Sequence, residues 1–287
     1  MLAITGATGQ LGRLVIEALL KKVPAAQIVA AVRQVDKAQD LAELGIQVRY
    51  ADYSKPESLR EAFSGVSKVL LISSSEVGQR AAQHQAVIDA AKSANVELLA
   101  YTSILNAESS SLMLAEEHVA TEAAIRESGV PAVILRNGWY SENYTMGIAP
   151  ILQHGVMIGC AGEGRISSAP RRDYAEAAAT VLTQDGQAGK VYELAGDQGF
   201  TLAEFAGYLS ELTGRSITYQ NLPEADYVQA LEGAGVPAPF PVVLGNSETG
   251  AAAGDLFSVS KDLSQLIGHP TTPIDATIKD ALATVSA

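Results

Sequence analysis

The chain has 287 residues, a formal net charge of −12 and a hydrophobic fraction of 47%. A chain of this length buries a substantial core either as one large α/β domain or as two smaller domains. The acidic balance argues against nucleic acid and anionic membranes as partners, because contacts with phosphate groups need clustered Lys and Arg.

The cysteine and histidine contents indicate the cellular compartment of the protein and whether it binds a metal ion. Cys160 is the only cysteine, which excludes an internal disulfide and suits a reducing compartment. The four histidines lack the spacing of metal ligands, so we expect no metal. No stretch resembles a secretory signal or reaches the length of a membrane span, and we expect a soluble cytoplasmic protein. The oligomeric state stays open, with a homodimer as one option.

The first predicted element is a strand that turns into a helix through a glycine-rich loop. Residues 3–5 continue an apolar run typical of a buried strand, and from Leu11 the apolar positions follow a helical period. Gly6, Gly9 and Gly12 form the pattern G-x-x-G-x-x-G. In dinucleotide-binding folds such glycines allow a tight turn, close approach to a pyrophosphate and close helix packing. We interpret the loop as a phosphate site, and a purely structural turn is the alternative.

The following elements alternate between strand and helix. Ser54 and Glu57 have capping-box spacing at the start of one helix, with Pro56 in its first turn. The alternation predicts an α/β fold with a doubly wound parallel sheet of six strands, that is, a Rossmann domain. The further strands are predicted at 27–33, 46–52, 68–75, 96–103 and 131–137, and the helices at 37–45, 54–63, 80–94 and 112–128.

Beyond residue 137 the alternation loosens. We predict a dinucleotide-binding domain over residues 1–137 and mainly a smaller substrate lobe over 138–287, with some segments returning to the first domain. A strand is expected at 216–222. The Pro- and Gly-rich stretch 233–254 is interpreted as a surface loop, with a lid over the pocket as the less favoured alternative.

Polar residues at the strand ends are the candidates for a ligand site, because ligands of such sheets lie outside the carboxyl ends of the strands. Arg33 ends the second strand, 21 residues after Gly12, where an acidic residue would bind the ribose of NAD. A guanidinium there can pair with the 2′-phosphate of NADP, and a solvated surface arginine is the alternative.

Two further strand ends extend this candidate site. Asp52 can accept a hydrogen bond from the amino group of the cofactor's adenine, and Tyr53 can supply apolar contact to it. The alternative is that Asp52 is an acidic residue leading into the next helix and Tyr53 is a surface tyrosine. Ser73, Ser74 and Ser75 are small enough to let a ribose and nicotinamide pass close to the backbone, and for any one of them a simple turn is the close alternative.

One general acid that some oxidoreductases use is absent from the sequence. None of the ten tyrosines has a lysine four residues later, so a Tyr-x-x-x-Lys mechanism is unsupported. The same absence weakens the hypothesis of an epimerase of nucleotide sugars. No G-x-S-x-G motif is present either.

Several longer stretches carry a family resemblance: "LLISSSEVGQR" (70–80), "AYTS" (100–103), "LRNGWYSENY" (135–144), "KVYELAGD" (190–197) and "LIGHPTT" (266–272). With the glycine loop and Arg33, they make the chain resemble the NmrA-like, atypical short-chain dehydrogenases, in particular the bacterial NADPH:quinone oxidoreductases of type 2. The likeness runs over essentially the whole chain.

The resemblance implies an NADPH-dependent, two-electron reduction of quinones by direct hydride transfer. It also implies a set of cofactor-binding residues. With the residues at the strand ends, the candidates are Gly6, Ala7, Thr8, Gly9, Gln10, Leu11, Gly12, Arg33, Asp52, Tyr53, Ser73, Ser74, Ser75, Asn137, Gly138, Trp139, Tyr140, Ser141, Glu142 and Arg171. For Arg171, or its neighbour Arg172, a surface ion pair is the alternative.

The substrate side is predicted at Trp139, Asn143 and Tyr144, with Tyr140 and Asn143 as the catalytic candidates. A flat quinone can stack on an aromatic ring, and the Asn143 amide can donate to a quinone oxygen as charge develops on it. Core anchors and a helix cap are the alternative roles. A different function also fits the family, namely a redox sensor that binds the dinucleotide without turnover and controls a partner.

Overall fold

A computed structural model describes residues 1–285 of the chain. Within them, the main sheet has seven strands in the order β3-β2-β1-β4-β5-β6-β8, all paired in parallel. The predicted doubly wound parallel sheet is therefore confirmed, with one strand more than expected. The strands are β1 (Leu2–Thr5), β2 (Ile28–Val32), β3 (Gln47–Tyr50), β4 (Lys68–Leu71), β5 (Leu98–Ile104), β6 (Ala132–Asn137) and β8 (Val191–Leu194).

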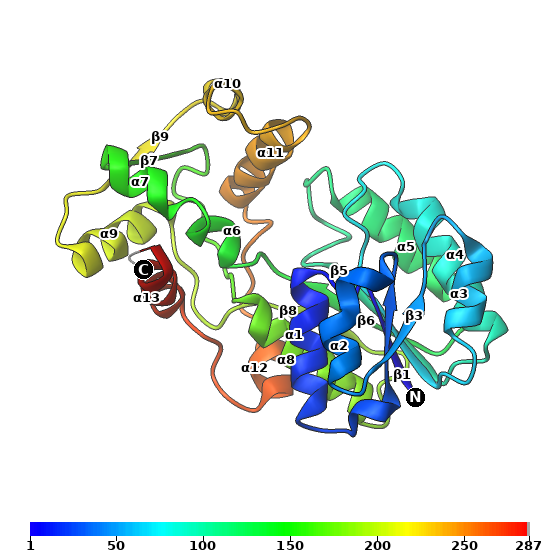
Figure 1. The fold of residues 1–287 in the computed structure, drawn as a ribbon. Helices are drawn as coiled ribbons and strands as arrows, with labels where there is room; N and C mark the ends of the chain where they lie inside the picture. The colour runs from blue at the N-terminus through cyan, green and yellow to red at the C-terminus, as the bar shows by residue number, and fades with distance from the viewer. Residues whose placement is uncertain (286–287) are drawn as a thin grey trace.

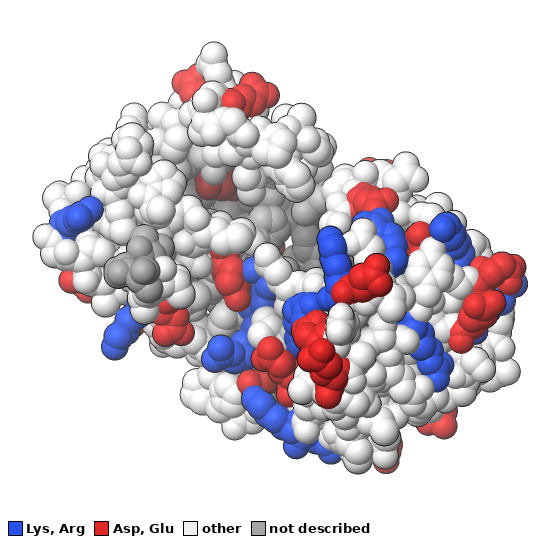
Figure 2. All heavy atoms as spheres, in the orientation of Figure 1, with Lys and Arg blue, Asp and Glu red and all other residues white. Residues whose placement is uncertain are grey.

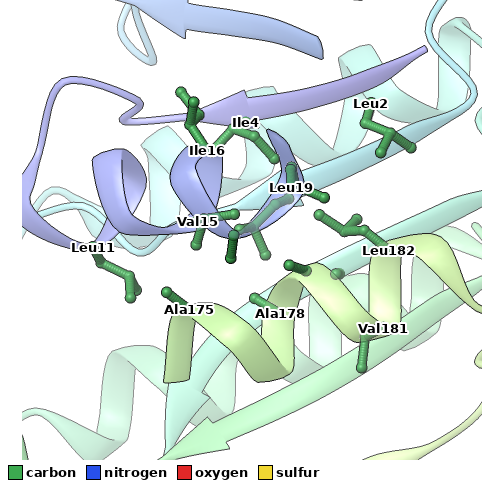
Figure 3. Packing of buried hydrophobic residues seen from close by; sticks show 14 of the residues in the cluster. Leu2, Ile4, Leu11, Val15, Ile16, Leu19, Ala175, Ala178, Val181 and Leu182 are labelled. Carbon is green, nitrogen blue, oxygen red and sulfur yellow. The ribbon is translucent and has the colours of Figure 1, made fainter. Parts of the chain in front are cut away.

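Side chains alternate between the two faces of this sheet, and each face has its own helical layer (Figure 1). One face is covered by α1 (Gln10–Leu20), α2 (Gln39–Glu43), α8 (Arg171–Thr183) and α12 (Asp262–Ile267), and the other by α3 (Pro56–Ala62), α4 (Arg80–Ser93) and α5 (Ala115–Ser128). Figure 3 shows Val15 and Leu19 of α1 facing Ala178 and Leu182 of α8. This packing fixes the start of α1 at the carboxyl edge of the sheet.

A smaller unit lies beside the sheet (Figure 1). It contains α6 (Glu142–Thr145), α7 (Ile148–His154), α9 (Leu202–Thr213), α10 (Glu224–Gly233), α11 (Phe240–Ala253), α13 (Ile274–Val285) and a two-stranded sheet of β7 (Val156–Gly159) and β9 (Thr218–Asn221). Its core is separate and includes Ile148, Phe200, Phe205 and Leu209. Because α8, β8 and α12 pack with the main sheet, the chain passes between the units several times; the domain boundary at residue 137 stays a prediction.

The stretch 233–254 is mostly helix, so its interpretation as a surface loop is wrong. Helix α11 covers Phe240–Ala253 although it contains Gly245 and Gly250. A Cβ at Gly245 would lie 2.7 Å from Cγ2 of Val228, and one at Gly250 would lie 2.4 Å from Cδ2 of Leu112. Close packing thus requires these glycines and outweighs their helix cost of about 1 kcal/mol each.

The predicted capping box at Ser54 is also wrong. Helix α3 begins at Pro56 after Lys55, and within residues 1–285 no side chain caps it. The Ser58 hydroxyl instead accepts the backbone N–H of Asp52 at 2.9 Å. This bond holds the end of β3 at the sheet edge. Over the described part of the chain, the helices are too short or too polar to span a bilayer.

Candidate functional site

Two adjoining pockets open at the carboxyl edge of the main sheet, where Figure 2 shows the surface hollowed between the two units. The loop pocket, of about 330 Å³, is lined by the glycine loop, Arg33, Asp52, Tyr53 and residues 72–76. The aromatic pocket, of about 590 Å³, is lined by residues of β5, the 137–143 segment, Arg171 and α11. The two pockets share Ser73, Ser75 and Glu76. A single elongated ligand can therefore extend from one into the other.

The glycine loop forms the end of the loop pocket. Gly6 has φ +60°, a conformation that favours glycine, and its carbonyl accepts the Gly9 N–H at 2.9 Å. A Cβ on Gly12 would lie 2.4 Å from the Gly6 carbonyl oxygen and 2.8 Å from Cα of Ala7. Gly9 precedes α1 without a side-chain cap, which leaves the first N–H groups of the helix available to an anion.

Arg33 lies across the loop pocket from this helix start. Its Nη1 is 2.6 Å from Oε1 of Glu76, and both side chains are largely exposed. The pair raises the pKa of Arg33 and lowers that of Glu76. Arg33 is thus a charged guanidinium at the mouth of the pocket, held by a carboxylate that a phosphate group would have to displace.

Asp52 and Tyr53 form the wall between Arg33 and the strand ends. The Tyr53 hydroxyl lies 2.6 Å from Oγ1 of Thr5 and 2.8 Å from the Ile72 carbonyl oxygen. These contacts tie the ends of three neighbouring segments together, and burial raises the pKa of the phenol far above its usual value. The ring therefore stays neutral and offers a rigid apolar face.

Side chains of α4 and β5 hold the backbone of the segment of three serines in place by hydrogen bonds. The Ser73 N–H donates to Oγ1 of Thr102 at 2.9 Å, and the Ser74 N–H donates to Nε2 of His84 at 2.9 Å. Nε of Arg80 donates to the Ser74 carbonyl at 2.6 Å. The shared wall of the two pockets is thus held in place without a ligand.

Two buried histidines support this segment. Desolvation lowers the pKa of His84 to about 4 and that of His118 to about 3, with Arg80 adding repulsion in both cases. Nε2 of His118 lies 3.5 Å from Arg80, and its Nδ1 lies 2.7 Å from the Tyr101 hydroxyl. Both rings are therefore neutral near pH 7, and His118 and Arg80 reach the wall of the aromatic pocket.

In the aromatic pocket, Arg171 organises the candidate substrate residues. Its Nη2 donates to Oδ1 of Asn143 at 3.1 Å, and its guanidinium lies 4.4 Å from the ring centre of Tyr140. Since the Asn143 oxygen is used by Arg171, its amide N–H₂ group is the part left to donate into the pocket. Arg171 itself is held by Glu142, whose carboxylate accepts the Arg171 backbone N–H at 2.9 Å.

Tyr140 is a weak candidate for an acid. Desolvation raises its pKa, and Nδ2 of Asn137 donates to its hydroxyl at 3.3 Å. An activated tyrosine would need a lowered pKa. Tyr140 therefore supplies a neutral hydroxyl and a ring face to the pocket. The buried Oδ1 of Asn137 makes no hydrogen bond within residues 1–285, so an acceptor is left beside this ring for a ligand.

Not every predicted residue reaches these two pockets. Ser141 is fully buried, and its hydroxyl oxygen lies within hydrogen-bond distance, 2.8 Å, of the Ser168 hydroxyl oxygen. The Glu142 carboxylate accepts a backbone N–H at the start of α8. Tyr144 packs edge-on against Phe200 in the smaller unit. Among the candidates, the loop pocket is lined by Gly6, Thr8, Gly9, Arg33, Asp52, Tyr53, Ser73, Ser74 and Ser75, and the aromatic pocket by Ser73, Ser75, Asn137, Gly138, Trp139, Tyr140, Asn143 and Arg171. Ala7, Gln10, Leu11 and Gly12 line neither; they shape the loop and the start of α1.

Other lining residues were missed by the sequence analysis. They include Glu76, Arg80, His118 and Phe240. Glu76 directly follows the serine segment, so its position could have been noticed. Arg80 and His118 lie on helices, where nothing in the local sequence separates a pocket residue from a surface residue. Phe240 belongs to the stretch that was interpreted as a loop.

Comparison with known proteins identifies the family. Residues 6–185 match the model of a family described as NAD(P)H-binding. The chain belongs to this NAD(P)H-binding family. It is 56% identical to quinone oxidoreductase 2 of Escherichia coli K12 over 96% of each chain. The resemblance inferred from the sequence motifs is confirmed.

Two solved structures match nearly the whole chain. A crystal structure of an NADPH-dependent quinone oxidoreductase of E. coli complexed with NADPH has a TM-score of 0.96 and 55% identity, covering 98% of this chain and 100% of that one. The triphenylmethane reductase of a Citrobacter species, complexed with NADP(H), has a TM-score of 0.95 and 43% identity, with 98% and 100% covered.

The residues of the two pockets fit a phosphorylated dinucleotide. The glycine loop leaves no room for a Cβ at Gly12 and presents the helix start, Arg33 supplies a cation at one end, and the unsatisfied Asn137 oxygen lies toward the other. The dinucleotide cofactor expected from the sequence thus agrees with both the family and the pocket chemistry.

Proposed function

We propose that this protein reduces quinones with NADPH by direct two-electron transfer. The observation that carries the proposal is the junction of two pockets: a phosphate-type pocket with Arg33 adjoins an aromatic pocket through Ser73, Ser75 and Glu76. A dinucleotide held in the first can thus present its reactive end to a flat substrate in the second. The 56% identity with a quinone oxidoreductase over nearly the full chain supports the same activity.

We assign the cofactor to residues of the loop pocket and its shared wall. The helix start behind Gly9 would bind the pyrophosphate, and Arg33 would bind the 2′-phosphate. Asp52 and Tyr53 would contact the adenine. Ser73 and Ser75 would line the path to the nicotinamide, near Asn137. When bound, NADPH supplies the hydride.

The substrate would lie in the aromatic pocket beside Trp139 and Tyr140. Arg171 fixes the amide of Asn143, whose N–H₂ group then donates to the quinone oxygen on which negative charge develops. This donor is set in place before the substrate arrives, so little reorganisation is needed. One quinone, one NADPH and one proton give hydroquinone and NADP⁺, and water entering through the open pocket can deliver the proton, since the pKa of Tyr140 is raised.

A panel assay tests the activity. Purified protein with NADPH should oxidise the cofactor in the presence of simple benzoquinones and naphthoquinones, followed as a fall in absorbance at 340 nm. A flat trace across the panel, together with heat on NADPH injection in calorimetry, would instead identify a dinucleotide sensor without turnover. No heat on injection would exclude both functions.

We also propose that the protein works in the cytoplasm. Cys160 is buried, and desolvation raises the pKa of its thiol to about 12, so it stays a thiol. NADPH is itself a cytoplasmic reductant, which matches that compartment. Fractionation of the source cells, with the protein followed by antibody, tests the location.

A further inference from the structure

A third cavity lies inside the smaller unit. This lobe pocket, of about 480 Å³, is enclosed by α6, α7, β7, α10 and α11. Its volume falls within the range of small-molecule sites, which is about 300–1,000 Å³. The roles assigned so far to the loop and aromatic pockets make no use of it.

The walls of the lobe pocket are mainly apolar. Ile151, Met157, Leu231 and Leu244 come to it from four different elements, and the buried ring of Tyr144 closes one side. An apolar cavity of this size offers water few partners and is best filled by a hydrocarbon group. The lining therefore suits an aliphatic chain better than a polar group.

The lobe pocket adjoins the aromatic pocket. Trp139 and Asn143 line both. Since Asn143 is the proposed donor to the quinone oxygen, a ring bound there lies directly at the shared wall. A substituent that leaves the ring on that side would continue into the lobe pocket.

The charge of the lobe pocket restricts this substituent. Glu248 is 7% exposed, accepts the backbone N–H of Cys160 and interacts with Tyr227. The described lining residues include no Lys or Arg, and His154 at the exposed rim is the other titratable group besides the tyrosines. A carboxylate entering the pocket would thus meet a buried acid without a cation to pair with it.

We propose that the lobe pocket binds an uncharged hydrocarbon side chain of the quinone, while the quinone ring occupies the aromatic pocket. This inference rests on the proposed quinone reduction and narrows its substrate class to ring quinones that carry an alkyl or isoprenoid tail. Quinones with an acidic tail are excluded.

The test uses naphthoquinones that share the same ring system and differ in the side chain. The four side chains are none, a short alkyl chain, a longer alkyl chain, and the longer chain ending in a carboxylate. We expect kcat/KM to rise by up to about fourfold for each methylene group that enters the pocket, and to lose this gain with the carboxylate. Equal kcat/KM across the alkyl series would overturn the inference. An inactive parent quinone would contradict the proposed function instead.

Two variants locate the effect. Ala230→Phe, on α10 and in the lining, should reduce the ratio of kcat/KM for the long-chain to the unsubstituted quinone toward one. Ala225→Phe places the same ring at an exposed position of the same helix outside the lining, and the ratio should stay as in the parent protein. A high ratio in Ala230→Phe would place the tail elsewhere.

A third variant tests the charge argument. Glu248→Gln keeps an oxygen to accept the Cys160 N–H but removes the acid. It should raise the ratio of kcat/KM for the carboxylate-tailed quinone to kcat/KM for the neutral long-chain quinone at least severalfold. No gain for the acidic tail would show that Glu248 does not control selection.

Discussion

At the scale of single residues, we expect Arg33 to determine the preference for a 2′-phosphate. Its side chain is 61% exposed and pairs with the carboxylate of Glu76. A charge-assisted hydrogen bond contributes about 1.5–3 kcal/mol, and the exposure favours the lower end of that range.

Arg33→Gln should therefore raise KM for NADPH about tenfold while leaving KM for NADH nearly unchanged. Steady-state kinetics with both cofactors measure the two effects. Arg60→Gln, at an exposed ion pair of α3 outside the pockets, serves as the control. Equal losses for both cofactors would remove Arg33 from the 2′-phosphate site.

Glu76 is expected to weaken binding of the same phosphate, because it competes for Arg33. It pairs with Arg33 at 2.6 Å and accepts from Nε2 of Gln83 at 2.8 Å. Glu76→Gln keeps the segment in place but frees the guanidinium and removes a negative charge. We expect KM for NADPH to fall two- to fivefold, the scale of an exposed ion pair worth about 0.5–1 kcal/mol. If KM for NADH falls by the same factor, the substitution acts by changing the conformation of the segment around Glu76 and not through the 2′-phosphate.

Asn143 is expected to act in the transition state. Asn143→Asp keeps the oxygen that accepts from Arg171 and removes the amide donor. Loss of one such donor should lower kcat about 100-fold, whereas the dissociation constant for NADPH should remain unchanged. Rapid-mixing kinetics and calorimetry measure these separately. A raised KM with normal kcat would limit Asn143 to substrate binding.

At the scale of elements, the main sheet was predictable because its strands are short apolar runs separated by regular helices. Arg33, Asp52 and the serine segment were found for the same reason, since they directly end predicted strands. The smaller unit lacked that regularity. Helix α11 was missed because Gly245 and Gly250 disfavour an isolated helix, and the tightest contacts that explain them are with Val228 and Leu112 of other elements.

Other parts of the site depend on contacts that sequence spacing does not reveal. Arg171 and Asn143 are 28 residues apart, yet their contact orients the proposed amide donor. Tyr144 follows Asn143 in sequence but faces the lobe pocket rather than the aromatic pocket. Asn143 lines both pockets whereas Tyr144 lines only the lobe pocket, and a sequence motif cannot reveal this difference.

Glycines in helices give a prediction at this scale. Gly12→Ala should place a Cβ 2.4 Å from the Gly6 carbonyl, which moves α1 away from the loop. Gly207 lies exposed in α9, and a methyl group added there would have open space around it. Gly207→Ala should raise the stability by about 0.5–1 kcal/mol, and Gly12→Ala should lower it by several kcal/mol and weaken NADPH binding.

Thermal unfolding with and without NADPH distinguishes the two variants. Gly207→Ala should raise Tm by about 1–2 °C and keep the full stabilisation by the cofactor. Gly12→Ala should lower Tm and lose most of that stabilisation. Normal cofactor stabilisation in Gly12→Ala would mean that the loop tolerates the methyl group and that the close contact is not required.

At the scale of the whole molecule, buried histidines make stability depend on pH. His84 is fully buried between Ser74 and Thr121, and desolvation lowers its pKa to about 4 from about 6.5 in an unfolded chain. The folded protein must keep the ring neutral, whereas the unfolded chain gains a proton below pH 6.5. The contribution of His84 is therefore full above pH 6.5 and is lost as the pH falls toward 4.

Comparison of the parent protein with His84→Gln isolates this effect, because glutamine does not titrate. Between pH 6.5 and 5.0 the parent should lose about 2 kcal/mol more of its unfolding free energy than the variant. Urea unfolding followed by the fluorescence of Trp139, the single tryptophan, measures it at both pH values. Glu248 and Asp173, whose pKa values burial raises, act in the opposite direction but are common to both proteins. Because His84 in the folded protein stays neutral above its pKa of about 4, NADPH affinity should change little between pH 6.5 and 5.0 in either protein. Parallel losses of unfolding free energy in both proteins would assign the acid sensitivity to other groups.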